Sequence, residues 1–185
     1  DAVARELGID RSAAASTLLG ARRRLLDFRS RRVRPGLDDK VLTSWNALAI
    51  AGLLRAGRAL GEQDWIGMAE AALDALRRTV WRDGRLYATR RGGEPALAGY
   101  LDDYAFLLAA LVEAMQTRMR PEDYAWSIEL ADALVDRFED RERGGFWFTA
   151  HDHERLFHRT MPGHDDATPS GNGVASRALV ALGHL

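Results

Sequence analysis

The sequence predicts an all-α fold, a partial α/α toroid of helical hairpins with short β-strand turns between them. Helices that are apolar on nearly every side alternate with helices that have one polar face, and a glycine-rich turn follows each pair. The series recurs about every 60 residues, because Asn46, Tyr104 and Asn172 hold corresponding places 58 and 68 residues apart. We expect the apolar helices to form an inner ring and the amphipathic helices to return around it.

Length and composition fit a domain with a substantial core, and they exclude several classes of protein. The chain has 185 residues, a net charge of −1 and no cysteine. A near-neutral charge gives no field that favours nucleic acid or a membrane, and the lack of cysteine excludes disulfides and thiolate zinc sites within this chain. With no signal peptide or 18-residue apolar run, a cytoplasmic location is expected. Because the chain opens at Asp1 without methionine, we expect it to be part of a longer protein.

Residues 1–34 are expected to form a basic helical lead-in. A short helix is predicted over residues 2–7 and a longer one from Ser12 to about Arg29. Seven arginines between Arg22 and Arg34 make this the most basic stretch of the chain. Arginines of this kind can bind phosphates, but no groove-binding motif is present, so a solvated helix face is favoured and no nucleic-acid partner is expected.

The predicted toroid occupies residues 35–185 and contains about two and a half hairpins. Its first inner helix, about 44–60, is apolar on nearly every side and should therefore be buried all round. Gly61 should end that helix. An amphipathic outer helix is predicted at about 64–80, and an Asp-Gly turn at 83–84 should lead into a short extended segment.

The same series is predicted twice more. The second inner helix runs from Leu101 to about Thr117, and its outer helix runs from Pro121, a residue suited to the first helical position, to Phe138. Residues 144–148 correspond to the first turn and strand, and a third inner helix follows 168–172. All inner helices should begin on one side. The flanks of a partial ring should expose apolar surface, so we expect this segment to aggregate, dimerise or need further hairpins.

Polar clusters precede all three inner helices and would meet at that shared end. Four aspartates are candidate catalytic groups, as acid, base or nucleophile at a glycosidic bond: Asp38, Asp39, Asp102 and Asp103. Candidate substrate-binding residues are Lys40, which is the only lysine, Trp45, Asn46, Tyr100, Tyr104, His164, Asp165, Asp166, Ser170 and Asn172. Carboxylates beside aromatic rings suit sugars, whose C–H faces stack on rings while their hydroxyls bond to acids and amides.

Several of these residues also have a purely structural interpretation. Asp102, Asp103 and Ser170 stand at helix starts, where Asp and Ser are common caps, and Trp45 and Tyr104 are also plausible core aromatics. Four histidines lie close in sequence: His151, His153, His158 and His164. They lack a further ligand at suitable spacing, so no metal and no other cofactor is expected, and His164 is the best acid–base candidate among them.

The motifs around the clusters resemble those of the spermatogenesis-associated, thioredoxin-domain-containing protein family (the bacterial YyaL type). The resemblance covers nearly the whole chain and rests on RVRPGLDDKVLTSWNALAIAGL, GYLDDYAFLLAAL, GGFWFTA and DDATPSGNGVASRAL. It implies a thioredoxin-like domain, absent from this chain, followed by a six-hairpin α/α toroid similar to glycoside hydrolases and N-acylglucosamine 2-epimerases. Ala47 and Asp166 stand where the family usually has glycine.

The resemblance implies a toroid that is carbohydrate-active or sugar-binding, similar to a glycoside hydrolase or a sugar epimerase. The alternative is a non-catalytic scaffold that binds a protein or a small ligand for the missing thioredoxin-like domain. Expected partners are thus a sugar-like small molecule and the thioredoxin-like domain, without nucleic acid or membrane. Since one fold hosts many activities, the choice between these functions depends on the site.

Overall fold

A computed structural model describes residues 2–185. The chain divides into two compact units, Asp1–Asp38 and Asp39–Leu185, so the division lies four residues after the predicted one. The first unit contains helices α1 (Ala2–Glu6) and α2 (Arg11–Ser30), close to the predicted helices. The boundary assigns Asp38 to the first unit and the other candidate site residues to the second.

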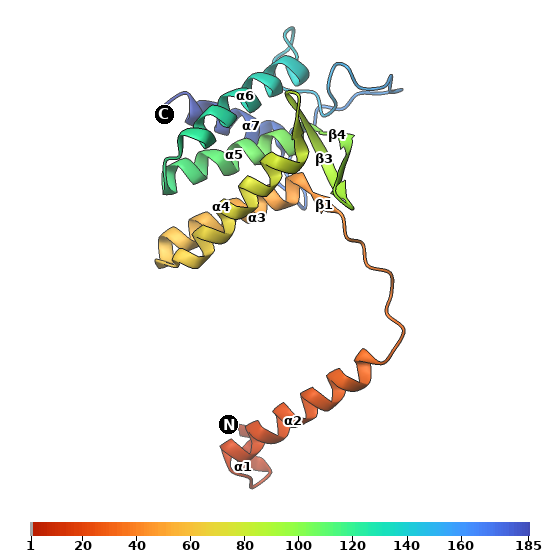
Figure 1. The fold of residues 1–185 in the computed structure, drawn as a ribbon, viewed down its shortest axis with the longest axis vertical. Helices are drawn as coiled ribbons and strands as arrows, with labels where there is room; N and C mark the ends of the chain where they lie inside the picture. The colour runs from red at the N-terminus through yellow and green to blue at the C-terminus, as the bar shows by residue number, and fades with distance from the viewer. Residues whose placement is uncertain (1) are drawn as a thin grey trace. The chain divides into compact units, whose positions relative to one another are not determined.

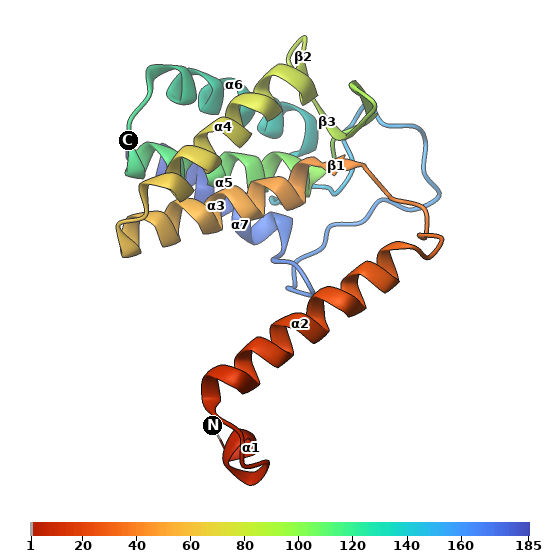
Figure 2. The ribbon, with the colours of Figure 1, turned by 60° about the horizontal axis from the view of Figure 1, so that its bottom comes forward.

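The second unit is a partial α/α toroid, as predicted. Its helices are α3 (Thr43–Leu60), α4 (Gln63–Val80), α5 (Leu101–Thr117), α6 (Pro121–Phe138) and α7 (Gly171–Leu182). Helix α5 packs between α3 and α7, while α4 packs on α3 and α6 packs on α5. Figure 2 shows α3, α5 and α7 side by side as one layer, with α4 and α6 as the other.

Burial differs sharply between the two inner helices of the complete hairpins. Helix α5 has an inner neighbour on each side, and 13 of its 17 residues are buried. Helix α3 buries only five residues, as many as the outer helix α4. Trp45 and Leu60 of α3 are 65% and 67% exposed. The prediction that α3 is buried all round is therefore wrong in this chain, because only one of its flanks is covered by another inner helix.

The exposed flanks carry the apolar surface predicted for a partial ring. On α3 the open face runs along Trp45, Ala49 and Gly52, and on α7 Val180 is 63% exposed. Association through these flanks stays a prediction. Within residues 2–185, no helix combines the length and the apolarity needed to cross a membrane.

A small antiparallel sheet lies at one end of the helices, where α3 begins (Figure 1). Its central strand β3 (Arg85–Arg91) pairs with β1 (Val41–Leu42), β2 (Trp81–Arg82) and β4 (Glu94–Ala98). The sequence predicted one short extended segment here. It missed the second turn at Gly92–Gly93, where both glycines have positive φ.

The predicted counterpart of this sheet in the second hairpin is reduced. Gly144 and Gly145 form a turn with φ of 79° and 78°, and a single antiparallel bridge joins Glu139 to Phe146. The bridge corresponds to the Trp81–Leu86 pair of β2 and β3. The turn expected over residues 144–148 is thus present, but the strand is not.

Candidate functional site

The three inner helices begin at one place, as predicted. The backbone N–H of Ser44, in the first turn of α3, donates to Asp103 Oδ1 of α5 at 3.0 Å. Gly171, the first residue of α7, lies so close to α5 that a Cβ there would overlap Asp102 Oδ1. Two adjacent aspartates at the start of α5 therefore join the beginnings of all three helices.

Asp103 holds backbone groups in place. It is 4% exposed, and its second oxygen accepts from the Tyr100 N–H at 2.9 Å. Its two oxygens thus cap α5 and also serve the start of α3, whose own N-cap, Leu42, has no side-chain acceptor. Burial raises the pKa of Asp103 to about 6. The hydrogen bonds from the N–H groups of Tyr100 and Ser44 lower this pKa, but burial has the larger effect. The geometry is that of a structural cap.

Asp102 has a different environment. It is half-buried in the first turn of α5, beside the first residue of α7, and burial raises the pKa of its carboxyl group. Two helix starts favour a negative charge there, while the loss of water opposes it. A carboxyl group at a partly open position can bind a hydroxyl group of a ligand or exchange a proton with it.

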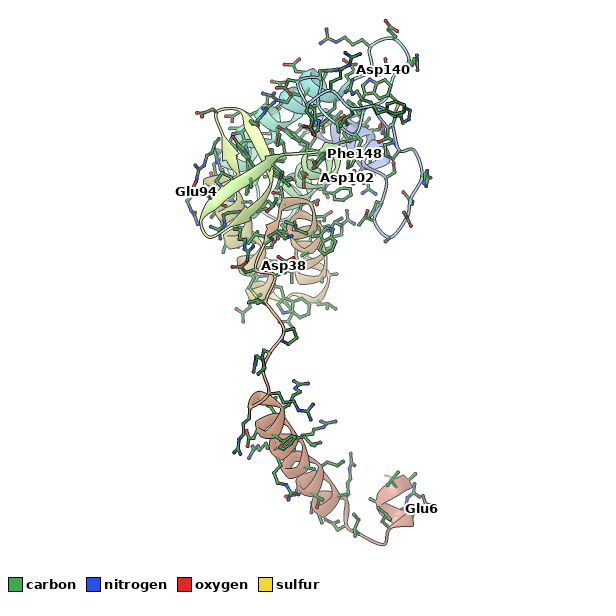
Figure 3. The ribbon with its side chains drawn as sticks, turned by 90° about the vertical axis from the view of Figure 1, so that its right-hand side faces the viewer. Glu6, Asp38, Glu94, Asp102, Asp140 and Phe148 are labelled. Carbon is green, nitrogen blue, oxygen red and sulfur yellow. The ribbon has the colours of Figure 1, made fainter. Side chains whose placement is uncertain are left out.

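An aromatic stack stands next to Asp102. The rings of Tyr100 and Phe148 lie 5.1 Å apart and nearly parallel, and the ring of His153 lies 6.0 Å from that of Tyr100. Figure 3 shows Asp102 and Phe148 from the side of the sheet. The Phe148 carbonyl accepts from the Leu101 N–H at 3.0 Å, which fixes this ring beside the start of α5. Phe148 and His153 were not among the predicted site residues, although Phe148 belongs to the GGFWFTA motif.

Tyr104 and Asn46, both predicted to bind a ligand, have contacts within the fold. Tyr104 is 1% exposed, its ring packs 5.1 Å from that of Phe138, and its hydroxyl accepts from the Leu86 N–H at 2.9 Å. It is therefore a core residue. Asn46 donates to the Leu42 carbonyl at 2.8 Å and thereby ties the first turn of α3 to β1.

The polar side chains at the start of α7, Ser170 and Asn172, also stabilise the fold. Asn172 accepts from the Phe146 N–H at 2.7 Å and donates to the carbonyls of Phe146 and Pro162 at 2.9 and 3.0 Å. Ser170 is 7% exposed; its hydroxyl donates to Pro162, and its N–H donates to Asp165. These side chains fix the loop before α7 and have little capacity left for a ligand.

The remaining predicted residues lie on exposed parts of the chain. Asp39 accepts from Arg91 Nε at 2.7 Å, and both side chains are more than half exposed. Asp38 belongs to the first unit. Lys40, His164 and Asp166 are exposed on loops. Within the second unit the structure brings together Asp102, Asp103 and Tyr100, with Trp45 exposed one residue after Ser44.

The histidines form no metal centre in the part of the chain that the structure describes. His151 Nε2 lies 3.0 Å from the Glu139 carbonyl, and the other ring nitrogen lies 3.5 Å from Arg159. No group of three His, Cys, Asp or Glu side chains among residues 2–185 is placed to hold a metal ion.

Comparisons with known sequences identify relatives of the chain. No protein-family model matches it. Spermatogenesis-associated protein 20 of Homo sapiens is 29% identical over 190 residues, which cover 97% of this chain and 24% of that protein. An uncharacterized protein of Caenorhabditis elegans is 29% identical over 166 residues, which cover 85% of this chain and 22% of that protein. The chain thus spans about a quarter of the length of these relatives.

Comparisons with solved structures show the fold. A sugar epimerase from a ruminal bacterium has a TM-score of 0.64 at 17% identity over 80% of this chain and 40% of its own. A family 105 glycoside hydrolase of C. acetobutylicum has a TM-score of 0.62 at 12% identity, over 80% of this chain and 44% of its own. The unsaturated glucuronyl hydrolase of Bacillus sp. GL1 has a TM-score of 0.58 at 22% identity, over 81% of this chain and 42% of its own. The chain is thus similar in sequence to spermatogenesis-associated protein 20, and its fold is part of an α/α toroid.

Proposed function

We propose that the chain is part of a carbohydrate-active or sugar-binding toroid whose ligand lies at the shared start of the inner helices. The observation that carries the proposal is the half-buried carboxyl group of Asp102, whose pKa is raised, beside the stacked rings of Tyr100 and Phe148. A carboxyl group and an aromatic surface recognise different parts of a sugar, its hydroxyls and its C–H faces.

Asp102 is the acid of this site, and the aromatic residues position the sugar. Its half-buried carboxyl group, whose pKa is raised by burial, can donate a proton to a leaving oxygen or bind a hydroxyl group. Asp103 is committed to the N–H groups of Tyr100 and Ser44. A hydrolase with two carboxylates would thus need a second carboxylate other than that of Asp103.

The solved structures with this fold support the carbohydrate proposal as an analogy of fold. Those named above are a sugar epimerase, a glycoside hydrolase and a glucuronyl hydrolase. Their identities with this chain are 12–22%, which supports the fold alone, whereas Asp102, Tyr100 and Phe148 supply the chemistry of the proposed site.

The second candidate function is a scaffold that binds the thioredoxin-like domain expected in the full-length protein. A specific observation favours it: Asp103, Asn46, Ser170 and Asn172 all use their polar groups to stabilise the fold. A scaffold needs a stable toroid but no free acid. The half-buried carboxyl of Asp102 is the feature that this alternative leaves unexplained.

A sugar-array screen of the full-length protein separates the two candidates. The carbohydrate proposal expects binding to a limited set of sugars and a loss of at least about tenfold in affinity for Tyr100→Ala, which removes the stacking surface. Tyr124→Ala is a matched control, because Tyr124 is exposed on the outer helix α6. Binding to no sugar, with tight binding to the isolated thioredoxin-like domain, would replace the proposal with the scaffold.

A further inference from the structure

A small hollow lies on the inner face of the helical layer. Its volume is about 180 Å³, and all of its lining residues come from α3, α5 and α7, including Arg55, Glu113, Gln116 and Arg177. Because the outer helices α4 and α6 contribute none of the lining, the hollow faces the interior of the ring. It is also distant from the helix starts: Glu113 follows Asp102 by eleven residues, or about 16 Å along α5.

A buried carboxylate fixes two arginines beside this hollow. Glu113 is 6% exposed, and its two oxygens accept from Arg55 Nε and from an Arg58 terminal nitrogen, each at 2.6 Å. Arg58 also donates to the Thr117 hydroxyl at 3.2 Å. A buried carboxylate requires such pairing. As a result both guanidinium groups are held in place, while the Arg55 and Arg58 side chains stay 57% and 43% exposed.

Positive charge exceeds negative charge at this position. Arg55 and Arg177 line the hollow against the single carboxylate of Glu113, an excess of one positive charge, and Arg58 adds a third guanidinium group through its ion pair with Glu113. Arg58 is in the last turn of α3, where a cation stabilises the helix dipole. The dipole of α3 therefore accounts for the presence of Arg58. Arg177 lines the hollow from α7, its side chain is exposed, and it forms no ion pair with a carboxylate among residues 2–185.

We propose that this hollow binds the anionic group, a carboxylate or a phosphate, of the toroid's ligand. The fork of N–H donors on arginine matches both groups, and Arg55, which Glu113 holds in place, loses little freedom on binding. The inference rests on the proposed carbohydrate function and narrows it to acidic sugars. A ligand that reaches both Asp102 and the hollow is elongated, with its acidic unit at the end near Arg177.

Titration calorimetry with three probes tests this inference on the full-length protein. Glucuronate and glucose 6-phosphate carry the two anionic groups, and glucose is the neutral reference. We expect at least one anionic probe to bind about tenfold to a hundredfold more tightly than glucose. A preference for glucuronate assigns a carboxylate ligand, and a preference for glucose 6-phosphate assigns a phosphate ligand.

Arg177→Gln should remove that preference without unfolding the protein, since the side chain is exposed on α7. Arg177→Lys, which keeps the charge but loses the fork, should retain part of it. Arg78→Gln, an exposed arginine on α4, is the matched control and should change nothing. Equal affinity for glucose and both anions, or a preference that survives Arg177→Gln, would overturn the inference.

The inference and the carbohydrate proposal can fail separately. If neutral and acidic sugars bind equally and the Asp102 carboxyl is needed for both, the carbohydrate function stands and the anion site is overturned. If inorganic phosphate binds through Arg177 while no sugar binds, the anion site is supported and the carbohydrate function is overturned.

Discussion

Asp102 and Asp103 are adjacent at the start of α5, yet they serve different parts of the molecule. Asp103 is turned toward backbone N–H groups and is 4% exposed, whereas Asp102 lies half-buried against α7. Consecutive residues of a helix point about 100° apart, so an Asp-Asp pair cannot share one environment. One acid of the pair therefore stabilises the fold, and the other is left available to a ligand.

The largest effect on stability is expected from Asp103→Ala. It leaves the buried N–H groups of Tyr100 and Ser44 without acceptors and should lower the free energy of unfolding by about 2–4 kcal/mol. Asp103→Asn should also destabilise the protein, because one of the two acceptors becomes a donor. Urea unfolding measures both. A loss below about 0.5 kcal/mol for Asp103→Ala would show that the two bonds contribute little.

The second largest effect is expected in the pH dependence of stability, to which Asp103 should contribute. The pKa of Asp103 is raised from 3.8 to about 6 in the folded protein, so the folded state binds this proton more tightly than the unfolded state. The resulting stabilisation is complete below about pH 4 and is lost as the pH rises through 6, by at most about 3 kcal/mol.

The readout is the difference in unfolding free energy between the wild type and Asp103→Asn across this range. Other carboxyl groups cancel in that difference, and the amide does not titrate. The difference should decline from pH 4 to pH 6 and then level off. A difference that rises with pH would mean that the Asp103 pKa is lowered by its hydrogen bonds.

A smaller effect on stability is expected from a substitution at Gly171, which contacts Asp102. A methyl group in Gly171→Ala would overlap Asp102 Oδ1 and lie 3.1 Å from Leu101 Cγ, so α5 and α7 must separate, at a cost of about 1–3 kcal/mol. Adding Asp102→Ala should recover part of this loss. Gly173→Ala, whose methyl group would meet nothing nearer than 4.0 Å, is the control and should be neutral or stabilising.

Much of the fold could be predicted because its signals are local. Apolar periodicity, Pro121 and Gly61 located the helices to within a few residues, and the recurrence of the series predicted which helices are neighbours. The burial of α3 could not be predicted in the same way. It depends on what covers its second flank, whereas the pattern of α3 alone is that of a helix covered on both sides.

The candidate site was predicted less well because its polar residues have distant partners. Tyr104 bonds to Leu86, 18 residues earlier, and Asn172 bonds to Phe146, 26 residues earlier. Those contacts depend on the sheet and on the loop before α7, for which residue spacing gives no signal. The sequence showed where polar side chains gather, but not which of them form hydrogen bonds within the fold.

The most direct test of the account compares Asp102→Asn with Asp103→Asn in the full-length protein. Two quantities are measured for each: the free energy of unfolding, and the affinity for a sugar selected on the array. Asp102→Asn should lose at least about tenfold in affinity and keep its stability, since a neutral amide avoids burial of a charge. Asp103→Asn should lose stability, and its affinity should change less than that of Asp102→Asn. If Asp102→Asn binds the sugar normally while losing stability as Asp103→Asn does, Asp102 is a second structural residue and the proposed site is wrong.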